Sequence, residues 1–211
     1  MRVRRQPDRG RYDRATVDAA LDDGLVAHVA FVDAGQPFCV PMMYARVDES
    51  VLVHGATSSR TLRTLATGVP ACVTVTAVHG LVLARSAFEH SANYRAVMLL
   101  GSFAPVADAN RVAAFEALTN KLVPGRWDEV RAPNPKELRA TSILAMPIGA
   151  ASVKIRTGPP SDDDSPDAEL DAWAGVVPVV TGYGEPEPSP GLRGAITLDE
   201  SVRNLIAKRQ R

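Results

Sequence analysis

The segment from Val51 to Gly101 constrains the fold most strongly, because it alternates short apolar runs with turns and one short helix. Its first run, 51–54, alternates like a strand and gives way to small residues. A helix with leucines on one face follows, with Ser58 or Ser59 in the N-cap position and a glycine at its end. This order predicts a strand, a turn and a helix within a larger group of strands.

The start of this helix has the composition of an anion site. Backbone N–H groups at a helix N-terminus and the guanidinium of Arg60 would point at one spot, and both favour a phosphate. The glycines and the Lys-Ser/Thr pair of a P-loop are missing. From this pattern alone, an ordinary capped helix with a solvated arginine is the other interpretation.

Apolar runs of strand length recur on both sides of this unit and predict antiparallel strands. Residues 25–32 are almost continuously apolar, and a turn leads from them into the run 37–47. Pro41 interrupts the second run, so that strand is an edge, is bulged, or leaves backbone groups free for a ligand. Further strands are predicted at 70–78, at 81–88 after a turn at His79–Gly80, and at 94–103, 143–155 and 173–180.

The strand runs outweigh the helices, so the predicted fold is mainly β with peripheral helices. We expect an antiparallel β-barrel, closed or nearly closed. Its organisation would comprise a basic arm at 1–9, the barrel domain at 10–183, and a linker and C-terminal tail at 184–211. The tail is predicted to form a helix over 197–211.

The balance of basic and acidic residues limits the classes of partner that the protein can bind. The 211 residues carry 24 basic and 24 acidic side chains, and this balance argues against nucleic acid or an anionic membrane as a partner. No apolar run is long enough to span a bilayer, and we expect a cytoplasmic protein. Cys39 and Cys72 are interpreted as buried thiols, and no spacing typical of a metal site is present. Asp162–Asp164 is interpreted as a solvated acidic loop.

From about residue 9 to residue 180, the sequence resembles the pyridoxamine 5′-phosphate oxidase-like, FMN-binding split barrels, and most closely their flavin-nucleotide-binding branch. The resemblance is carried by an ordered set of motifs: His54-Gly55, Ser59-Arg60-Thr61-Leu62-Arg63-Thr64-Leu65, Val73-Thr74-Val75-Thr76, Leu81 through Phe88, His90-Ser91, Asn93-Tyr94-Arg95 and Gly101.

This resemblance implies a homodimer that holds FMN at the subunit interface. Ser59 and Arg60, with Ser58 beside them, match the phosphate-binding helix start. Further cofactor contacts are implied for the strand residues Val40, Pro41 and Met42, for His54 and Gly55, and for Arg85, Ser86, Asn93, Tyr94 and Arg95.

Three other residues are possible substrate contacts. His90 lies in a polar connection, where a loop hydrogen-bond network is the alternative to a role in binding. Lys154 and Arg156 alternate along one strand, where a solvated edge is the alternative to capture of an anion. No residue stands out as a catalytic acid, base or nucleophile.

The implied activity is that of a flavin-dependent oxidoreductase acting on a small molecule. The chain lacks the C-terminal substrate-gripping Arg-x-His element of true pyridoxamine phosphate oxidases, and Thr61 stands where oxidase-type members often place a lysine. We therefore do not expect vitamin B6 oxidase activity. The alternatives are a non-enzymatic flavin or haem carrier or sensor, and a deazaflavin-binding reductase.

Overall fold

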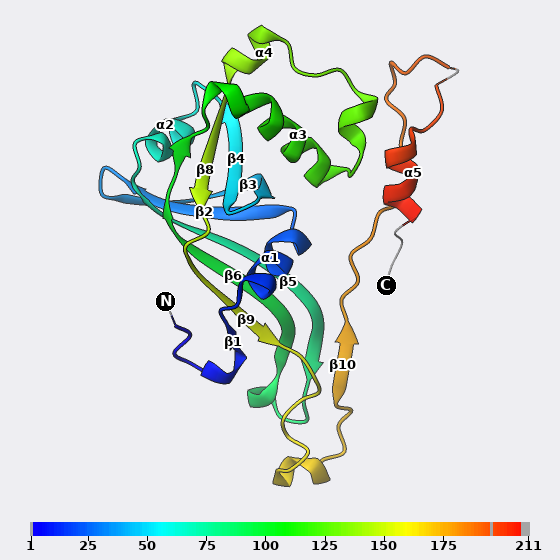
Figure 1. Ribbon diagram of the computed structural model, residues 1–211. Coiled ribbons are helices and arrows are strands. Elements are labelled where there is room, and N and C mark those ends of the chain that lie inside the picture. Colours follow the sequence, from blue (N-terminus) through cyan, green and yellow to red (C-terminus); the bar gives the residue numbers. More distant parts are fainter. Residues whose placement is uncertain (1, 195, 208–211) are drawn as a thin grey trace.

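Ten antiparallel strands form one curled sheet in the computed structural model, which describes residues 2–194 and 196–207 (Figure 1). The hydrogen-bonded order is β1-β9-β6-β5-β2-β3-β4-β8-β7, and β10 pairs with β5. The strands are β1 (Gly10–Arg11), β2 (Val26–Asp33), β3 (Gln36–Val47), β4 (Ser50–Ala56), β5 (Pro70–Leu83), β6 (Ser91–Ser102), β7 (Ala104–Pro105), β8 (Thr141–Pro147), β9 (Ala150–Arg156) and β10 (Gly175–Pro178).

Strand β3 connects the two halves of the sheet. Its residues 36–43 pair with β2, whereas Tyr44–Val47 pair with β4. The curled sheet is therefore split rather than closed. This arrangement confirms the predicted antiparallel split barrel, and of the closed and nearly closed forms that the sequence left open it is not the fully closed one.

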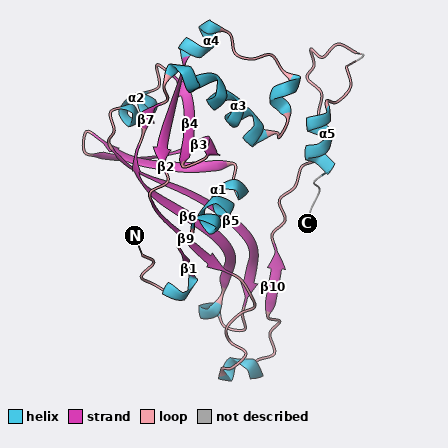
Figure 2. Cartoon of the chain, in the orientation of Figure 1, coloured by secondary structure: helices cyan, strands magenta, loops and turns pink. Residues whose placement is uncertain are grey.

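Five α-helices of the described residues lie at the periphery of the sheet (Figure 2). One of them, α1, supplies Val17, Ala20 and Leu21 to the main hydrophobic core, which also contains residues of β2, β4 and β5. None of the helices within the described ranges is long and apolar enough to cross a membrane. The helices are α1 (Arg14–Asp23), α2 (Arg60–Ala66), α3 (Arg111–Leu122), α4 (Pro135–Ala140) and α5 (Glu200–Ala207).

Several predicted boundaries were wrong. Strand β5 runs through the predicted turn at His79–Gly80 and absorbs it as a bulge between Val78 and Gly80. A Cβ at Gly80 would lie 2.8 Å from Val176 of β10, so the glycine permits close packing there instead of a reversal. The reversal comes after Leu83, through a 3₁₀ turn at Ala87–Glu89.

Three other predicted elements differ in extent from the observed ones. The predicted strand 143–155 is two strands, β8 and β9, separated at Ile148–Gly149. The predicted strand 173–180 is shortened to β10. Of the predicted helix 197–211, residues 200–207 are helical, and 208–211 lie outside the described residues.

The prediction that both cysteines are buried was also wrong. Cys39 is exposed and Cys72 is partly buried, and both are free thiols. They stand on either side of Ala30, which pairs with both of them in the sheet. Because Cα atoms two strands apart are separated by about 10 Å, the geometry excludes a disulfide between them.

Candidate functional site

The residues predicted to hold a phosphate lie in the turn from β4 to α2. Strand β4 ends just after His54 and Gly55, and α2 begins at Arg60. Ser59 is the N-cap, since its hydroxyl accepts the Leu62 N–H at 3.5 Å, whereas Ser58 is exposed. The first turn of α2 therefore opens beside the end of β4, as the sequence predicted.

The guanidinium of Arg60 is held by an aromatic ring rather than by an acid. It lies 4.2 Å from the ring centroid of Phe38 on β3, and Phe38 stacks on Phe31 of β2. Arg60 has no salt bridge within the described parts of the chain. The cation is therefore positioned but not neutralised.

His54 carries a buried nitrogen that the described protein atoms leave without a partner. Its Nδ1 is inaccessible to solvent and makes no hydrogen bond. Burial lowers the pKa of the imidazole, so the ring is neutral at pH 7. An unsatisfied buried polar atom costs about 1–3 kcal/mol, and a ligand that hydrogen-bonds to it would remove that cost.

Strand β3 offers a free edge close to this turn. Val40, Pro41 and Met42 pair with β2 on one side. Over 36–43 the other edge of β3 has no strand partner among the described residues. Pro41 is exposed there, which confirms that its strand is an edge at this point.

A second set of predicted residues gathers where β5 and β9 end and β6 begins. The backbone N–H of Arg85 donates to Asp162 at 2.6 Å, and its guanidinium donates to Asp163 at 2.9 Å. Arg156 donates to Asn93 at 2.6 Å and to the carbonyls of Gly158 and Pro159. These bonds hold the loop after β9 against the sheet.

The role of Asp162 was missed by the sequence analysis. Its side chain is fully buried (0% exposed), so the interpretation of 162–164 as a solvated loop is wrong at this position. A run of three aspartates gives no sign that one of them is buried by a distant arginine. Phe38 was missed as well, although an aromatic residue beside Pro37 on an edge strand was a usable signal.

The remaining predicted residues lie around this second set. His90 Nδ1 is 2.8 Å from the carbonyl of Ser86, which confirms a loop hydrogen bond at His90. Tyr94 pairs with Arg156 across the strands, and Lys154 lies two residues from Arg156 on the same face. Arg95 faces α1 and lies 3.5 Å from Asp23.

Within one chain, the predicted site residues therefore form two groups. The first comprises Val40, Pro41, Met42, His54, Gly55, Ser58, Ser59 and Arg60. The second comprises Arg85, Ser86, His90, Asn93, Tyr94, Lys154 and Arg156, with Arg95 on the side of α1. Strands β5 and β2 separate β6 from β3, so the sheet does not bring the two groups together.

The fold is an antiparallel split barrel, and it carries a cation, Arg60, at a capped helix start. The family model described as pyridoxamine 5′-phosphate oxidase matches residues 13–155, and the chain belongs to this family. A comparison with curated proteins gave no match.

Two solved structures are similar to this chain over nearly its whole length. The FAD and haem binding protein from Mycobacterium smegmatis is 41% identical, with a TM-score of 0.91, over 96% of this chain and 98% of that one. The flavocytochrome Anf3 from Azotobacter vinelandii is 36% identical, with a TM-score of 0.89, over 96% of this chain and 94% of that one.

Proposed function

We propose that this protein binds a flavin at the turn between β4 and α2. The observation that carries the proposal is the buried, unpartnered Nδ1 of His54, next to a helix start with an un-neutralised Arg60. These features fit a phosphate-bearing flavin: Ser59 and Arg60 would hold the phosphate, and His54 would hydrogen-bond to the ligand. The free edge of β3 would offer backbone groups to the ring system.

The flavin is either FMN or FAD, and both contain the phosphate that this site would hold. FMN is the expectation from the sequence, whereas the name of the Mycobacterium smegmatis relative specifies FAD. The identity of 41% over 96% of the chain favours FAD. Flavin released by denaturation and separated by chromatography would distinguish the two cofactors.

The protein is further proposed to be a homodimer with the flavin near the subunit interface. Large apolar side chains are exposed on one face of the sheet: Val26 on β2 is 40% exposed, and Met98 and Leu100 on β6 are 40% and 43% exposed. Cross-strand pairing places these residues with His28, Cys39 and Cys72 on that face. A second copy of the chain would bury this surface.

Haem is a second candidate cofactor, and one contact favours it. A carbonyl can only accept, so the bond between His90 and Ser86 places the proton on Nδ1 and leaves the Nε2 lone pair free. An exposed imidazole oriented in this way is typical of a metal-ligating histidine. Both relatives bear names that include haem or cytochrome.

We propose oxidoreductase activity on a small molecule, because a bound flavin supplies hydride and electron transfer. The chain's own residues would position the ring and exclude water from it. A carrier or sensor without turnover is the alternative, as is a deazaflavin-dependent reductase.

The absorbance spectrum of the protein as purified tests these proposals. Flavin bands at one equivalent per chain support the flavin site, and a Soret band in addition supports haem. A colourless protein that takes up neither flavin on reconstitution would contradict the proposed function. For haem, His90→Ala should shift or abolish the Soret band, whereas His79→Ala, at an exposed histidine in the bulge of β5, should leave it unchanged.

A further inference from the structure

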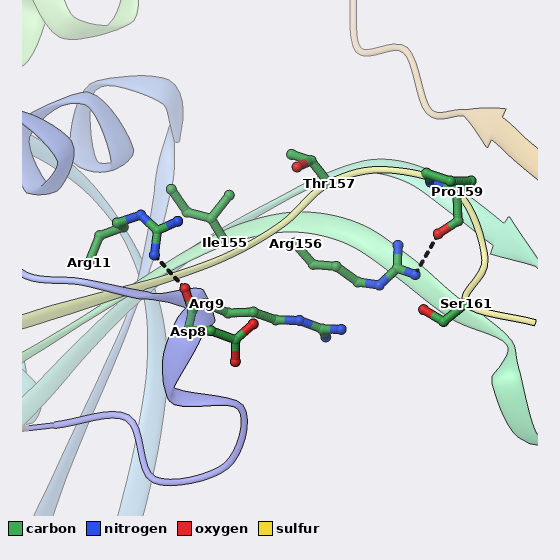
Figure 3. A pocket seen from close by; sticks show the side chains of 8 residues that line it. All are labelled: Asp8, Arg9, Arg11, Ile155, Arg156, Thr157, Pro159 and Ser161. Carbon is green, nitrogen blue, oxygen red and sulfur yellow. Dashed lines mark hydrogen bonds between the residues drawn. The ribbon is translucent and has the colours of Figure 1, made fainter. Parts of the chain in front are cut away.

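A pocket of about 300 Å³ opens where the N-terminal segment crosses the end of β9 (Figure 3). The 3₁₀ turn Pro7–Arg9 and strand β1 form one wall, because β1 pairs with β9 through Gly10 and Arg11. The lining consists of Asp8, Arg9, Arg11, Ile155, Arg156, Thr157, Pro159 and Ser161.

The charge in this pocket is strongly one-sided. Three arginines line it against one aspartate. Figure 3 shows the side chains of Arg9 and Arg156 extending in the same direction, toward Ser161. Within the described parts of the chain, neither forms a salt bridge with a carboxylate.

Arg156 is buried to an unusual degree for a charged residue without an acidic partner. Its residue is 6% exposed, and its guanidinium donates to Asn93, Gly158 and Pro159. Burial and the nearby charge of Arg9 lower its pKa, and Tyr94 and Glu89 offset this only in part. Because arginine nevertheless stays protonated, two like charges face one space, and an anion placed between them would relieve their repulsion.

We propose that this pocket binds a phosphate-bearing ligand with at least two negative charges, such as the diphosphate of a nucleotide. Guanidinium groups match phosphate oxygens in pairs, and the Thr157 and Ser161 hydroxyls add further donors. The volume is about ten times that of one water in the liquid, which leaves room for more than a single phosphate.

This site is separate from the proposed flavin phosphate site of the same subunit. Strands β6, β5 and β2 stand between β9 and β3 in the sheet, whereas Arg60 contacts β3. The anion site does not rest on the proposed function, because it is built from the N-terminal segment and the end of β9 alone.

Isothermal titration of the purified full-length protein with pyrophosphate and with ADP tests the proposal. We expect both to bind, and Arg9→Gln to weaken binding roughly 10- to 150-fold, the loss typical of a charge-assisted hydrogen bond. Arg5→Gln is the matched control, because Arg5 lies in the same arm, is exposed and does not line the pocket. Arg156→Lys, which keeps the charge but loses the paired donors, should also weaken binding.

Absence of binding by the wild-type protein would overturn the proposal, as would equal weakening by Arg9→Gln and Arg5→Gln. Circular dichroism of each variant separates loss of the site from loss of the fold. The flavin content of Arg9→Gln should equal that of the wild type; if the flavin were lost with Arg9, the pocket would be part of the flavin site and the separate site would be refuted. If the protein binds pyrophosphate but takes up neither FMN nor FAD on reconstitution, the proposed function is refuted and this site still stands.

Discussion

At the scale of single residues, His54 connects burial to a measurable pH dependence. Burial keeps its pKa below the ordinary value of 6.5 in the folded chain. As the pH falls through 6.5, the His54 imidazole takes up a proton in the unfolded chain but remains neutral in the folded chain. The contribution of His54 to stability is therefore complete above pH 6.5 and is lost as the pH falls through the lowered pKa.

Unfolding of the flavin-free protein in urea at about pH 7.5 and about pH 5.5 measures this effect. We expect the wild type to lose more stability on acidification than His54→Gln does. An equal loss in the wild type and His54→Gln would show that His54 is not the group responsible.

Asp162 is a residue whose role the fold alone reveals. It is fully buried and accepts the Arg85 N–H, so it fastens the loop after β9 to the end of β5. Asp162→Ala should cost about 1–3 kcal/mol, because a buried donor loses its acceptor. Hydrogen exchange over 157–165 should accelerate in this variant and stay unchanged in Asp164→Ala, whose side chain is exposed. Unchanged exchange in both variants would contradict this role.

At the scale of elements, local chemistry decided which predictions succeeded. Helix α2 with its Ser59 cap could be predicted because cap, leucine face and terminal glycine agree within a few residues. The turn at His79–Gly80 could not, because the bulge depends on Val176, about a hundred residues away in sequence. Turn residues in a sequence indicate a chain reversal. Only the packed structure shows when a glycine instead allows a neighbouring strand to pack closely against the backbone.

The same distinction applies to the candidate site. The position of Arg60 at a capped helix start could be predicted from its neighbours in sequence. The burial of Arg156 and the partner of Arg85 depend on the loop after β9, whose polar sequence shows no apolar pattern that would fix its position. The separation of the site residues into two groups likewise follows from strand order, which a sequence does not display.

Helix α4 provides an element-scale prediction. Asn134 accepts the N–H groups of Lys136 and Glu137, and the Glu137 side chain accepts the Asn134 N–H, completing a capping box. Asn134→Ala should cost about 1 kcal/mol and lower the Tm by about 2–4 °C. Asn134→Ser, which can still cap, should keep most of the stability in thermal melts. If Asn134→Ser lost as much thermal stability as Asn134→Ala, the capping explanation would be wrong.

At the scale of the whole molecule, the exposed face of the sheet predicts assembly. Leu100→Asp should convert the proposed dimer to monomers, because it places a charge among Val26, Met98 and their neighbours. Val112→Asp on α3 is the control, since Val112 is equally exposed but lies off the sheet. Light scattering after size exclusion gives the masses. A dimer that survives Leu100→Asp would place the interface elsewhere.

If the β4–α2 turn holds the phosphate of a flavin, the flavin affinity of Arg60→Ala is its most direct test. The control is Arg63→Ala, which removes an exposed arginine in the last turn of the same helix. Fluorescence titration of the flavin-free proteins should show a loss of about 1.5–3 kcal/mol in binding free energy for Arg60→Ala. Arg63→Ala should bind like the wild type. Equal flavin affinity in the wild type and Arg60→Ala would contradict the account.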